Sequence, residues 1–505
     1  MSSYRPDRAT FDELITRHPI VPVWREVLAD SQTPVAAFKR LALEPDSFLL
    51  ESVEGGERWA RYSFLGGDAF ARVEARDGRV TVDGDPPVAP DDGEPPLAYV
   101  RRTLESCRAP RLEGWGLPPL HGGAVGFLGY DCVRELERLP DAPPDDLGLP
   151  DLALLLTRTF VVFDHLAQKA FVITNVSRPS DPKRAYDDAL DRCDAVVERL
   201  AAPLEASPIE LSFDGPVGFE PDVDDDEYAH WVEVVKEHVY AGDIFQAVPS
   251  RRFEAPLGGS SFNAYRVLRT LNPSPYMYFL RFGATERHKE FEIAGSSPEP
   301  LVRVTGDKIV TRPIAGTRPR GATEAEDAAY ERDLLTDEKE RAEHVMLVDL
   351  ARNDVGRVAR YGSVKVDELM QIERYSHVMH IVSNVTGTLR EGTAAFDALT
   401  ACFPAGTVSG APKVRAMEII DSLERTKRGP YAGVVGYFDF SGNLDTCITI
   451  RTIVATDGRA FVQAGAGVVA DSVPATEADE TRRKAEVLFR AVAGSTALQE
   501  PRQPS

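Results

Sequence analysis

Apolar runs in the first 200 residues predict short strands and one long helix. The runs at 48–53 and 152–163 are rich in aliphatic and aromatic residues, which is typical of strands. Apolar residues recur at helical spacing over 182–200, after a proline that suits a first helical turn. Stretches rich in Pro and Asp at 83–96 and 140–150 predict surface loops.

Longer and more regular patterns begin near residue 226. An amphipathic helix is predicted over 228–240, where Gly242 suits the C-cap, and further helices over 337–351 and 476–493. Six strand-like runs lie at 276–281, 290–294, 308–312, 433–440, 446–454 and 460–465. Because the strands cluster instead of alternating strictly with helices, we expect an α+β fold with large, mainly antiparallel sheets flanked by helices.

Composition changes between these two parts predict a domain boundary. Residues 202–227 contain four prolines and an acidic run. We therefore predict an N-terminal domain at 1–205, a linker at 206–226, a second domain at 227–495 and a frayed tail at 496–505.

Two pairs of glutamates lie on the inward faces of predicted helices. Glu340 and Glu343 share a face that continues through leucines, and Glu477 and Glu480 share a face that continues through Lys484. Inward carboxylates are costly unless they are neutralised. Ion pairs with side chains such as Lys484 are one solution, and a divalent cation between the two helices is the other. All-oxygen ligands favour Mg²⁺ over zinc.

Other segments offer candidate chemistry, each with a plainer structural alternative. His377 and His380 suit proton transfer or ordinary structural roles. Arg451 lies in a strand-like run, where its guanidinium could bind a carboxylate through two hydrogen bonds or could face solvent at a sheet edge. The Gly/Thr/Ser-rich loop at 406–413 could hold an anion or form a simple turn. The glycines at 465–470 lack the context of a dinucleotide site, but they allow a close backbone approach by a ligand.

Composition and charge narrow the class of partner. The chain has 505 residues, of which 43% are hydrophobic and 27% charged, and the 80 acidic and 58 basic residues give a formal net charge of −22. This charge disfavours nucleic acid and anionic membranes, and an anionic substrate would need a local positive charge or a metal. Five scattered cysteines, no long apolar run and no signal-like N-terminus predict a cytoplasmic enzyme.

The second part resembles the chorismate-utilising enzymes, and within that family the large (component I) subunits of anthranilate synthase. The resemblance is carried by 241–253 (AGDIFQAVPSRRF), 272–277 (NPSPYM), 295–299 (GSSPE), 312–321 (RPIAGTRPRG), 343–354 (EHVMLVDLARND), 410–417 (GAPKVRAM) and 477–482 (EADETR). The N-terminal part contributes the shorter segments 49–52 (LLES) and 122–131 (GGAVGFLGYD).

The resemblance implies a Mg²⁺-dependent lyase reaction of tryptophan biosynthesis, in which chorismate and ammonia give anthranilate and pyruvate. It implies that Glu343 and Glu480 are direct metal ligands, with Glu340 and Glu477 as an outer pair. Its catalytic positions fall on His380, near the departing C4 hydroxyl, and on Thr407, Gln246 and Lys484. The family residues that bind a substrate carboxylate correspond to Tyr431, Arg451 and the backbone of Ala464, Gly465, Ala466 and Gly467.

Two positions discriminate between reactions within the family. Relatives that add water are expected to have a lysine where Gln246 stands, and relatives that make 4-amino-4-deoxychorismate a nucleophilic lysine where Ala315 stands. Both differences favour attack of ammonia at C2. Aminodeoxychorismate synthase component I is the alternative enzyme, and a non-catalytic tryptophan sensor is the alternative of another class.

The resemblance also implies a partner and an inhibitor. None of the five cysteines lies in a Gly-x-Cys-x-Gly nucleophile elbow, so we expect a separate glutamine amidotransferase subunit (component II) to supply ammonia. A tryptophan feedback site is implied in the N-terminal regulatory part and the adjoining strand, at Glu51, Ser52, Pro275, Tyr276 and Met277.

Overall fold

The computed structural model describes residues 4–41, 45–52, 61–112, 114–204, 218–375 and 378–498. His377, one of the two candidate histidines, lies outside the described residues, as do most of the predicted linker and the tail from 499. Within the described ranges, no helix combines the length and the apolar character needed to cross a membrane.

In the N-terminal part, the described residues form nine strands, four α-helices and one 3₁₀ helix. Its strands are β1 (Tyr4–Arg5), β2 (Ile20–Leu28), β3 (Ser47–Glu51), β4 (Tyr62–Arg76), β5 (Arg79–Gly84), β6 (Gly123–Leu128), β7 (Leu152–Asp164), β8 (Lys169–Ser177) and β9 (Glu220–Pro221). Its helices are α1 (Arg8–Arg17), α2 (Pro34–Leu41), α3 (Pro96–Ser106), η2 (Tyr130–Glu135) and α4 (Pro182–Ala201).

The remaining elements belong to the C-terminal part. The helices are α5 (Asp225–Ala241), α6 (Ser261–Leu271), α7 (Glu324–Thr336), α8 (Glu338–Val358), α9 (Ala395–Cys402), η3 (Gly406–Val408), α10 (Lys413–Leu423) and α11 (Pro474–Ala497). The strands are β10 (Gln246–Ala247), β11 (Ser250–Pro256), β12 (Tyr276–Phe282), β13 (Phe291–Ser297), β14 (Pro300–Thr305), β15 (Lys308–Thr311), β16 (Ile314–Pro319), β17 (Lys365–Arg374), β18 (Val378–Thr388), β19 (Gly410–Ala411), β20 (Val434–Asp439), β21 (Leu444–Ile448), β22 (Thr452–Thr456) and β23 (Arg459–Gly465).

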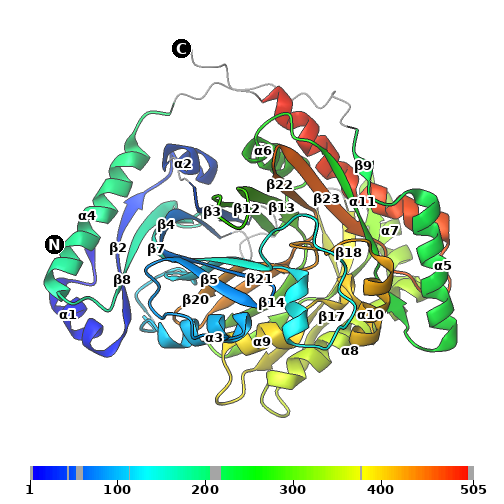
Figure 1. Ribbon diagram of the computed structural model, residues 1–505, viewed down its shortest axis with the longest axis horizontal. Helices are drawn as coiled ribbons and strands as arrows, with labels where there is room; N and C mark the ends of the chain where they lie inside the picture. The colour runs from blue at the N-terminus through cyan, green and yellow to red at the C-terminus, as the bar shows by residue number, and fades with distance from the viewer. Residues whose placement is uncertain are drawn as a thin grey trace.

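Antiparallel pairing joins almost all strands into one sheet with two arms, which confirms the predicted fold class (Figure 1). The first arm runs from β4 through β3, β12, β13, β22 and β23 to β11. The second runs from β7 through β6, β20, β21, β14 and β15 to β18. The arms meet where β4 pairs with β7.

Strands from both sides of the predicted linker pair with each other. Strand β3 pairs with β12, with Leu49 opposite Phe279, and β6 pairs with β20, with Phe127 opposite Val435. The N-terminal and C-terminal parts therefore share one hydrogen-bonded sheet.

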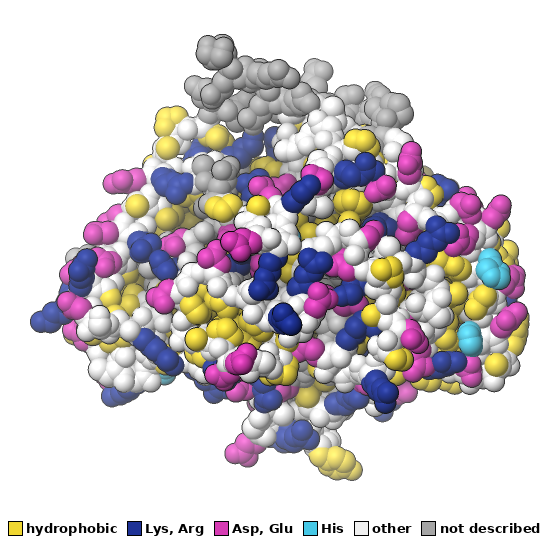
Figure 2. Space-filling view, viewed as in Figure 1, with side chains coloured by type: hydrophobic (Ala, Val, Ile, Leu, Met, Phe, Trp, Pro, Cys, Tyr) yellow, Lys and Arg dark blue, Asp and Glu magenta, His cyan; other side chains and the backbone are white. Residues whose placement is uncertain are grey.

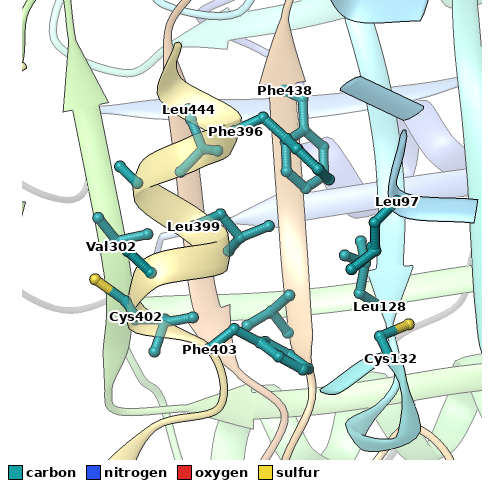
Figure 3. Close-up of a cluster of buried hydrophobic side chains, with 14 of the residues drawn as sticks. Leu97, Leu128, Cys132, Val302, Phe396, Leu399, Cys402, Phe403, Phe438 and Leu444 are labelled. Atoms are coloured by element: carbon teal, nitrogen blue, oxygen red, sulfur yellow. The ribbon is translucent and has the colours of Figure 1, made fainter. Parts of the chain in front are cut away.

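Apolar side chains fill the layers on both faces of the second arm. One core lies between the two arms and includes Phe64, Phe127, Tyr278 and Tyr437. The other packs β14, β20 and β21 against α3, α8 and α9, and Figure 3 shows Phe396 and Leu399 of α9 directed at Phe438 and Leu444. The helical periodicity of α9 places these side chains on one face, where burial of apolar area stabilises the contact.

Helices cover the outer faces of the sheet. Helices α6 and α11 lie against the first arm and α5 packs on α11, while α4 lies against β2 and β8, and α8 packs on β16 and β18 (Figure 1). Figure 2 shows acidic and basic side chains interspersed over the viewed face, so the negative net charge is not segregated there.

Most predicted elements lie close to observed ones, with one error that matters for function. The predicted helix at 182–200 is α4, and Gly242 caps α5 with a φ of 82°. The predicted strand at 446–454 is wrong, because the chain breaks into β21 and β22 around a corner that ends at Arg451, whose φ is 52°. The corner turns Arg451 out of the sheet, so it is not an edge-strand charge.

Candidate functional site

The two predicted carboxylate pairs lie on α8 and α11. Helix α8 begins after Asp337, whose carboxylate accepts hydrogen bonds from the amides of Lys339 and Glu340, and α11 begins with Pro474 in its first turn. Burial raises the pKa of Glu343, and so does the charge of Glu340. Burial likewise raises the pKa of Glu477. The predicted inward orientation of these two side chains is therefore confirmed.

The electrostatic contacts connect the two helices. The positive charge of Lys484 on α11 partly offsets the raised pKa of Glu343 on α8. In the same way, the charge of Lys339 on α8 partly offsets the raised pKa of Glu477 on α11. These reciprocal contacts place both carboxylate pairs around one region of the protein.

Two of the four glutamates form ion pairs. Glu480 lies 2.6 Å from Nζ of Lys484, and Glu340 lies 3.0 Å from Nη1 of Arg318. Glu343 accepts a hydrogen bond of 3.3 Å from Nε2 of Gln246, its only side-chain partner within the described chain. No three His, Cys, Asp or Glu side chains of the described ranges are grouped closely enough to hold a metal by themselves.

Arg451 projects into the same region as a half-buried cation. Its electrostatic neighbours are Tyr431, Glu480 and Glu299, and burial lowers its pKa. Its carbonyl accepts a hydrogen bond of 3.1 Å from the Ser296 amide, but among the described residues its guanidinium forms no hydrogen bond or ion pair. A half-buried guanidinium whose N–H donors have no fixed partner is suited to binding an anion.

The C-terminal end of β23 supplies backbone to the site. Lys484 donates a hydrogen bond of 3.0 Å to the carbonyl of Gly465, and the Ala466 amide contacts the Pro249 carbonyl and the Tyr228 hydroxyl. A Cβ atom at Gly467 would lie 2.5 Å from Nε2 of Gln246. Two residues earlier, a Cβ at Gly465 would lie 2.6 Å from the Pro249 carbonyl oxygen and 3.2 Å from the Tyr431 hydroxyl. Glycine is therefore required sterically where this backbone passes the polar side chains.

The carboxyl-terminal residues of β23 are thus near the predicted substrate-binding side chains. Ala464 is paired with Arg251 and Gly465 with Ser250 in the β11–β23 register. The backbone segment from Ala464 to Gly467 borders Tyr431, Gln246 and Lys484, so the structure brings these predicted site residues together.

His380 lies on β18 beside the same region. Its Nδ1 is 2.9 Å from the Gly316 carbonyl and 3.1 Å from Oγ1 of Thr317. Burial and the nearby charge of Arg451 lower its pKa. Because a carbonyl can only accept, Nδ1 carries the proton and the neutral ring presents Nε2 as an acceptor. The expected proton donor is therefore in its acceptor form at neutral pH.

Thr407 contacts Glu299, a residue to which the sequence assigned no role. Its hydroxyl donates a hydrogen bond of 3.0 Å to Oε1 of Glu299. Burial raises the pKa of Glu299 to about 8, even though Arg451 and Lys484 act in the opposite direction. Glu299 therefore holds a proton at neutral pH. The sequence signal was its position between Pro298 and Pro300, where two buried strands meet.

A separate cavity of about 320 Å³ lies between the two arms of the sheet. It is lined by all five residues predicted to bind tryptophan, Glu51, Ser52, Pro275, Tyr276 and Met277, together with residues of β4, β14, β20 and β21. The hydroxyl of Ser52 is buried and has no hydrogen-bond partner among the described residues.

Glu51 lines this cavity, but its carboxylate already has partners inside the protein. The Glu51 carboxylate accepts hydrogen bonds from the Tyr265 hydroxyl at 2.6 Å and from Nε and Nη2 of Arg269 at 3.1 and 3.2 Å. Its charge is already compensated inside the protein. The polar groups left to recognise a ligand include Ser52 and the Tyr276–Asp445 pair, whose oxygens are 2.9 Å apart.

Comparisons with known proteins agree with the geometry. Residues 48–490 match the family model described as chorismate binding enzyme. Anthranilate synthase component 1 of Mycolicibacterium smegmatis is 49% identical over 499 residues, which cover 98% of this chain and 95% of that protein. The protein of the same name from Pseudomonas putida is 49% identical over 481 residues, covering 94% and 95%.

Solved structures give the same result. Anthranilate synthase component I from Streptococcus pneumoniae superposes with a TM-score of 0.76 at 36% identity, covering 92% of this chain and 99% of that one. The menaquinone-specific isochorismate synthase of Escherichia coli has a TM-score of 0.69 at 18% identity, covering 96% and 100%, and indicates a shared fold.

Proposed function

Because the chain belongs to the family of chorismate binding enzymes, we propose that it converts chorismate and ammonia to anthranilate and pyruvate, as component I of an anthranilate synthase. The observation that carries the proposal is the half-buried guanidinium of Arg451, which has no side-chain partner in the part of the chain that the structure describes, near the protonated carboxyl of Glu299. One group suits an anionic substrate, and the other suits protonation of a poor leaving group.

Chorismate carries two carboxylates, so its binding requires compensating positive charge. Arg451 would form a forked contact with one carboxylate, and the Tyr431 hydroxyl and the β23 backbone would border it. Anchoring a substrate at two points reduces the entropy lost on reaching the reactive geometry.

Magnesium fits the other anchor. The donor set is entirely oxygen, and Glu343 is a desolvated carboxylate whose only side-chain partner within the described ranges is a weakly bonded amide. Glu343 and Glu480 would hold the ion, with Glu340 and Glu477 outside them. Mg²⁺ needs few protein ligands because it retains waters and accepts substrate oxygens. When bound, it would neutralise the second substrate carboxylate.

The protein side chains have separate roles in the ammonia step. The bond from nitrogen to C2 forms as the bond from C4 to its hydroxyl breaks, and a proton from Glu299 lets the hydroxyl leave as water. Thr407 orients the Glu299 carboxyl. The neutral imidazole of His380, which has no proton on Nε2, orients the substrate by accepting a hydrogen bond from it at Nε2. The added nitrogen loses a proton, which restores the acid form of Glu299. Loss of the C2 proton and cleavage of the bond from C3 to the enolpyruvyl oxygen then make the ring aromatic, and the departing enolate takes up a proton to become pyruvate.

The rival reactions are less consistent with the residues present. Gln246 donates to Glu343 and has no titratable base with which to activate water. Ala315 of β16 has no nucleophile for the route to 4-amino-4-deoxychorismate. A non-catalytic tryptophan sensor would not need a protonated Glu299 and an unpaired Arg451 in one region.

One assay tests the reaction directly. Purified protein is incubated with chorismate, MgCl₂ and ammonium at pH 8, and anthranilate is followed by its fluorescence. We expect product that depends on ammonium and is abolished by EDTA. The proposal is wrong if chorismate is unchanged, or if isochorismate or 4-amino-4-deoxychorismate accumulates. A control with NADH in place of MgCl₂ should give no product.

We further propose a glutamine amidotransferase subunit as the ammonia source and tryptophan as an inhibitor that binds the 320 Å³ cavity. The cavity has apolar walls and an unpaired Ser52 hydroxyl, which suit an indole ring with a polar backbone. Addition of glutamine to the purified chain should give no anthranilate unless the partner subunit is present.

A further inference from the structure

Arg428 is a buried arginine for which the proposed reaction gives no role. Its side chain is 1% exposed, and its guanidinium lies 4.5 Å from the ring centre of Tyr130 and 5.6 Å from that of Tyr431. A buried guanidinium is costly unless its donors are satisfied, so its presence between two rings requires specific partners.

Those partners come from three separate segments. Nε and Nη2 form a fork with the Glu424 carboxylate at 2.9 and 2.6 Å. Nη1 donates to the Val408 carbonyl and Nη2 to the Val248 carbonyl, both at 2.7 Å. A planar fork with five N–H donors can reach all of these acceptors together, whereas a lysine ammonium cannot.

Each segment leads to a residue of the candidate site. Val408 follows Thr407 in η3, and Val248 is two residues beyond Gln246. Tyr431 lies under the guanidinium itself. None of these three connections is made by α8 or α11, which carry the glutamates.

Glu424 extends the same group of contacts to β23. Its Oε1 accepts hydrogen bonds from the amide and the hydroxyl of Ser250, both at 2.8 Å. Ser250 is the register partner of Gly465. The Glu424 carboxylate therefore has two roles. It neutralises Arg428, and it holds the start of β11 next to the backbone of β23.

We propose that Arg428, held by Glu424, is a positioning residue that sets Thr407, Gln246 and Tyr431 in register with one another for the reaction. It does not touch the substrate and acts through these residues. The inference rests on the proposed function, and it assigns to one buried pair the alignment of side chains that come from three different segments.

The test compares Arg428→Lys with Arg134→Lys. Arg134 is the matched control, because it forms a fork with Asp421 of α10 at 2.9 and 3.0 Å and contacts none of the site residues. Since displacement of a reacting group by about 1 Å can cost on the order of 100-fold, we expect R428K to lower kcat about 100-fold. The KM for chorismate should change less than about threefold, because Arg451 remains as anchor. R134K should retain wild-type kcat.

A second measurement does not depend on activity. Hydrogen exchange at amides 246–250 and 406–410 should accelerate in R428K, while exchange at 434–439 in β20 should match the wild type. Equal kcat in the two variants, or uniform acceleration along the chain, overturns the inference. An inactive wild type overturns the proposed function instead, and the exchange pattern then still decides the positioning role.

A conservative second variant covers a failure of R428K to fold. Glu424→Gln keeps an acceptor for Ser250 but removes the charge that holds Arg428. We expect kcat to fall about tenfold, again with little change in KM. Wild-type kcat in a folded E424Q variant would contradict the proposal.

Discussion

Oγ1 of Thr407 donates a hydrogen bond of 3.0 Å to Oε1 of Glu299, a buried carboxyl whose pKa is raised to about 8. This pairing places a proton donor of suitable acidity at the end of a short loop, next to the cation of Arg451. General acids work best when their pKa lies near the working pH.

Replacement of Glu299 by Gln tests this assignment. We expect kcat to fall about 100-fold or more, because the amide cannot transfer a proton to the leaving hydroxyl. In the wild type, activity should decrease as the pH rises through about 8, since the acid form is lost there. The pH–rate profile of E299Q should lack this limb. An unchanged profile would assign the limb to another group.

The same substitution has an opposite consequence for stability. The folded chain binds the Glu299 proton more tightly than the unfolded chain, whose carboxyl has its ordinary value near 4.5. The resulting stabilisation is complete below pH 4.5 and is lost as the pH rises to about 8. E299Q should therefore lose less stability than the wild type between pH 5 and 8, as measured by urea unfolding.

Arg451→Lys should act mainly on substrate binding. Loss of the fork should raise the KM for chorismate about 10- to 100-fold, because a point charge cannot form the paired hydrogen bonds to a carboxylate. Steady-state kinetics at saturating ammonium provide the measurement. Arg459→Lys is the control, because Arg459 is half-exposed on β23 and pairs with Glu254. A change confined to kcat would argue against the predicted role.

Glu343→Gln separates metal binding from folding. Without Mg²⁺, the variant should melt about 2–4 °C higher than the wild type, because a desolvated carboxylate is replaced by a neutral amide. The concentration of Mg²⁺ needed for half-maximal activity should rise at least about tenfold. Glu486→Gln, an exposed position on α11, should alter neither quantity. Equal melting temperatures and Mg²⁺ dependence for wild type and E343Q would remove Glu343 from the metal site.

Ser52→Ala tests the inhibitor cavity. We expect tryptophan affinity, measured by calorimetry, to fall about 5- to 20-fold, since a hydrogen bond to the ligand is lost. Stability should be unchanged or slightly higher, because the hydroxyl has no partner among the described residues. Ser422→Ala, at the end of α10, should bind tryptophan like the wild type. Full inhibition of S52A would show that the ligand is recognised elsewhere.

Regular periodicity and motif resemblance predicted the fold class, and they selected side chains from distant segments that the structure places near one another. The inward glutamates on α8 and α11 are an example, because three-residue spacing on an apolar face fixes their direction before any tertiary contact is known. The predicted bounds of α4 and β7 are close to the observed ones because each element has a long, uniform pattern of apolar residues.

The errors come from features that no local pattern contains. The run at 446–454 reads as one strand because all of its apolar residues favour one, and the positive φ of Arg451 is imposed by the corner. The charge of Glu51 is neutralised by Arg269, which lies 218 positions away in the sequence. The importance of Glu299 and Arg428 depends on burial, which raises the pKa of the first and requires partners for the second.

The pairing of β3 with β12 and of β6 with β20 has a consequence for protein engineering. A chain cut near residue 220 would leave two long apolar edges unpaired in the C-terminal fragment, and such edges are templates for aggregation. Both parts are therefore needed to complete the sheet, and fragments intended for isolated study should be co-expressed so that each exposed edge pairs with its native neighbour.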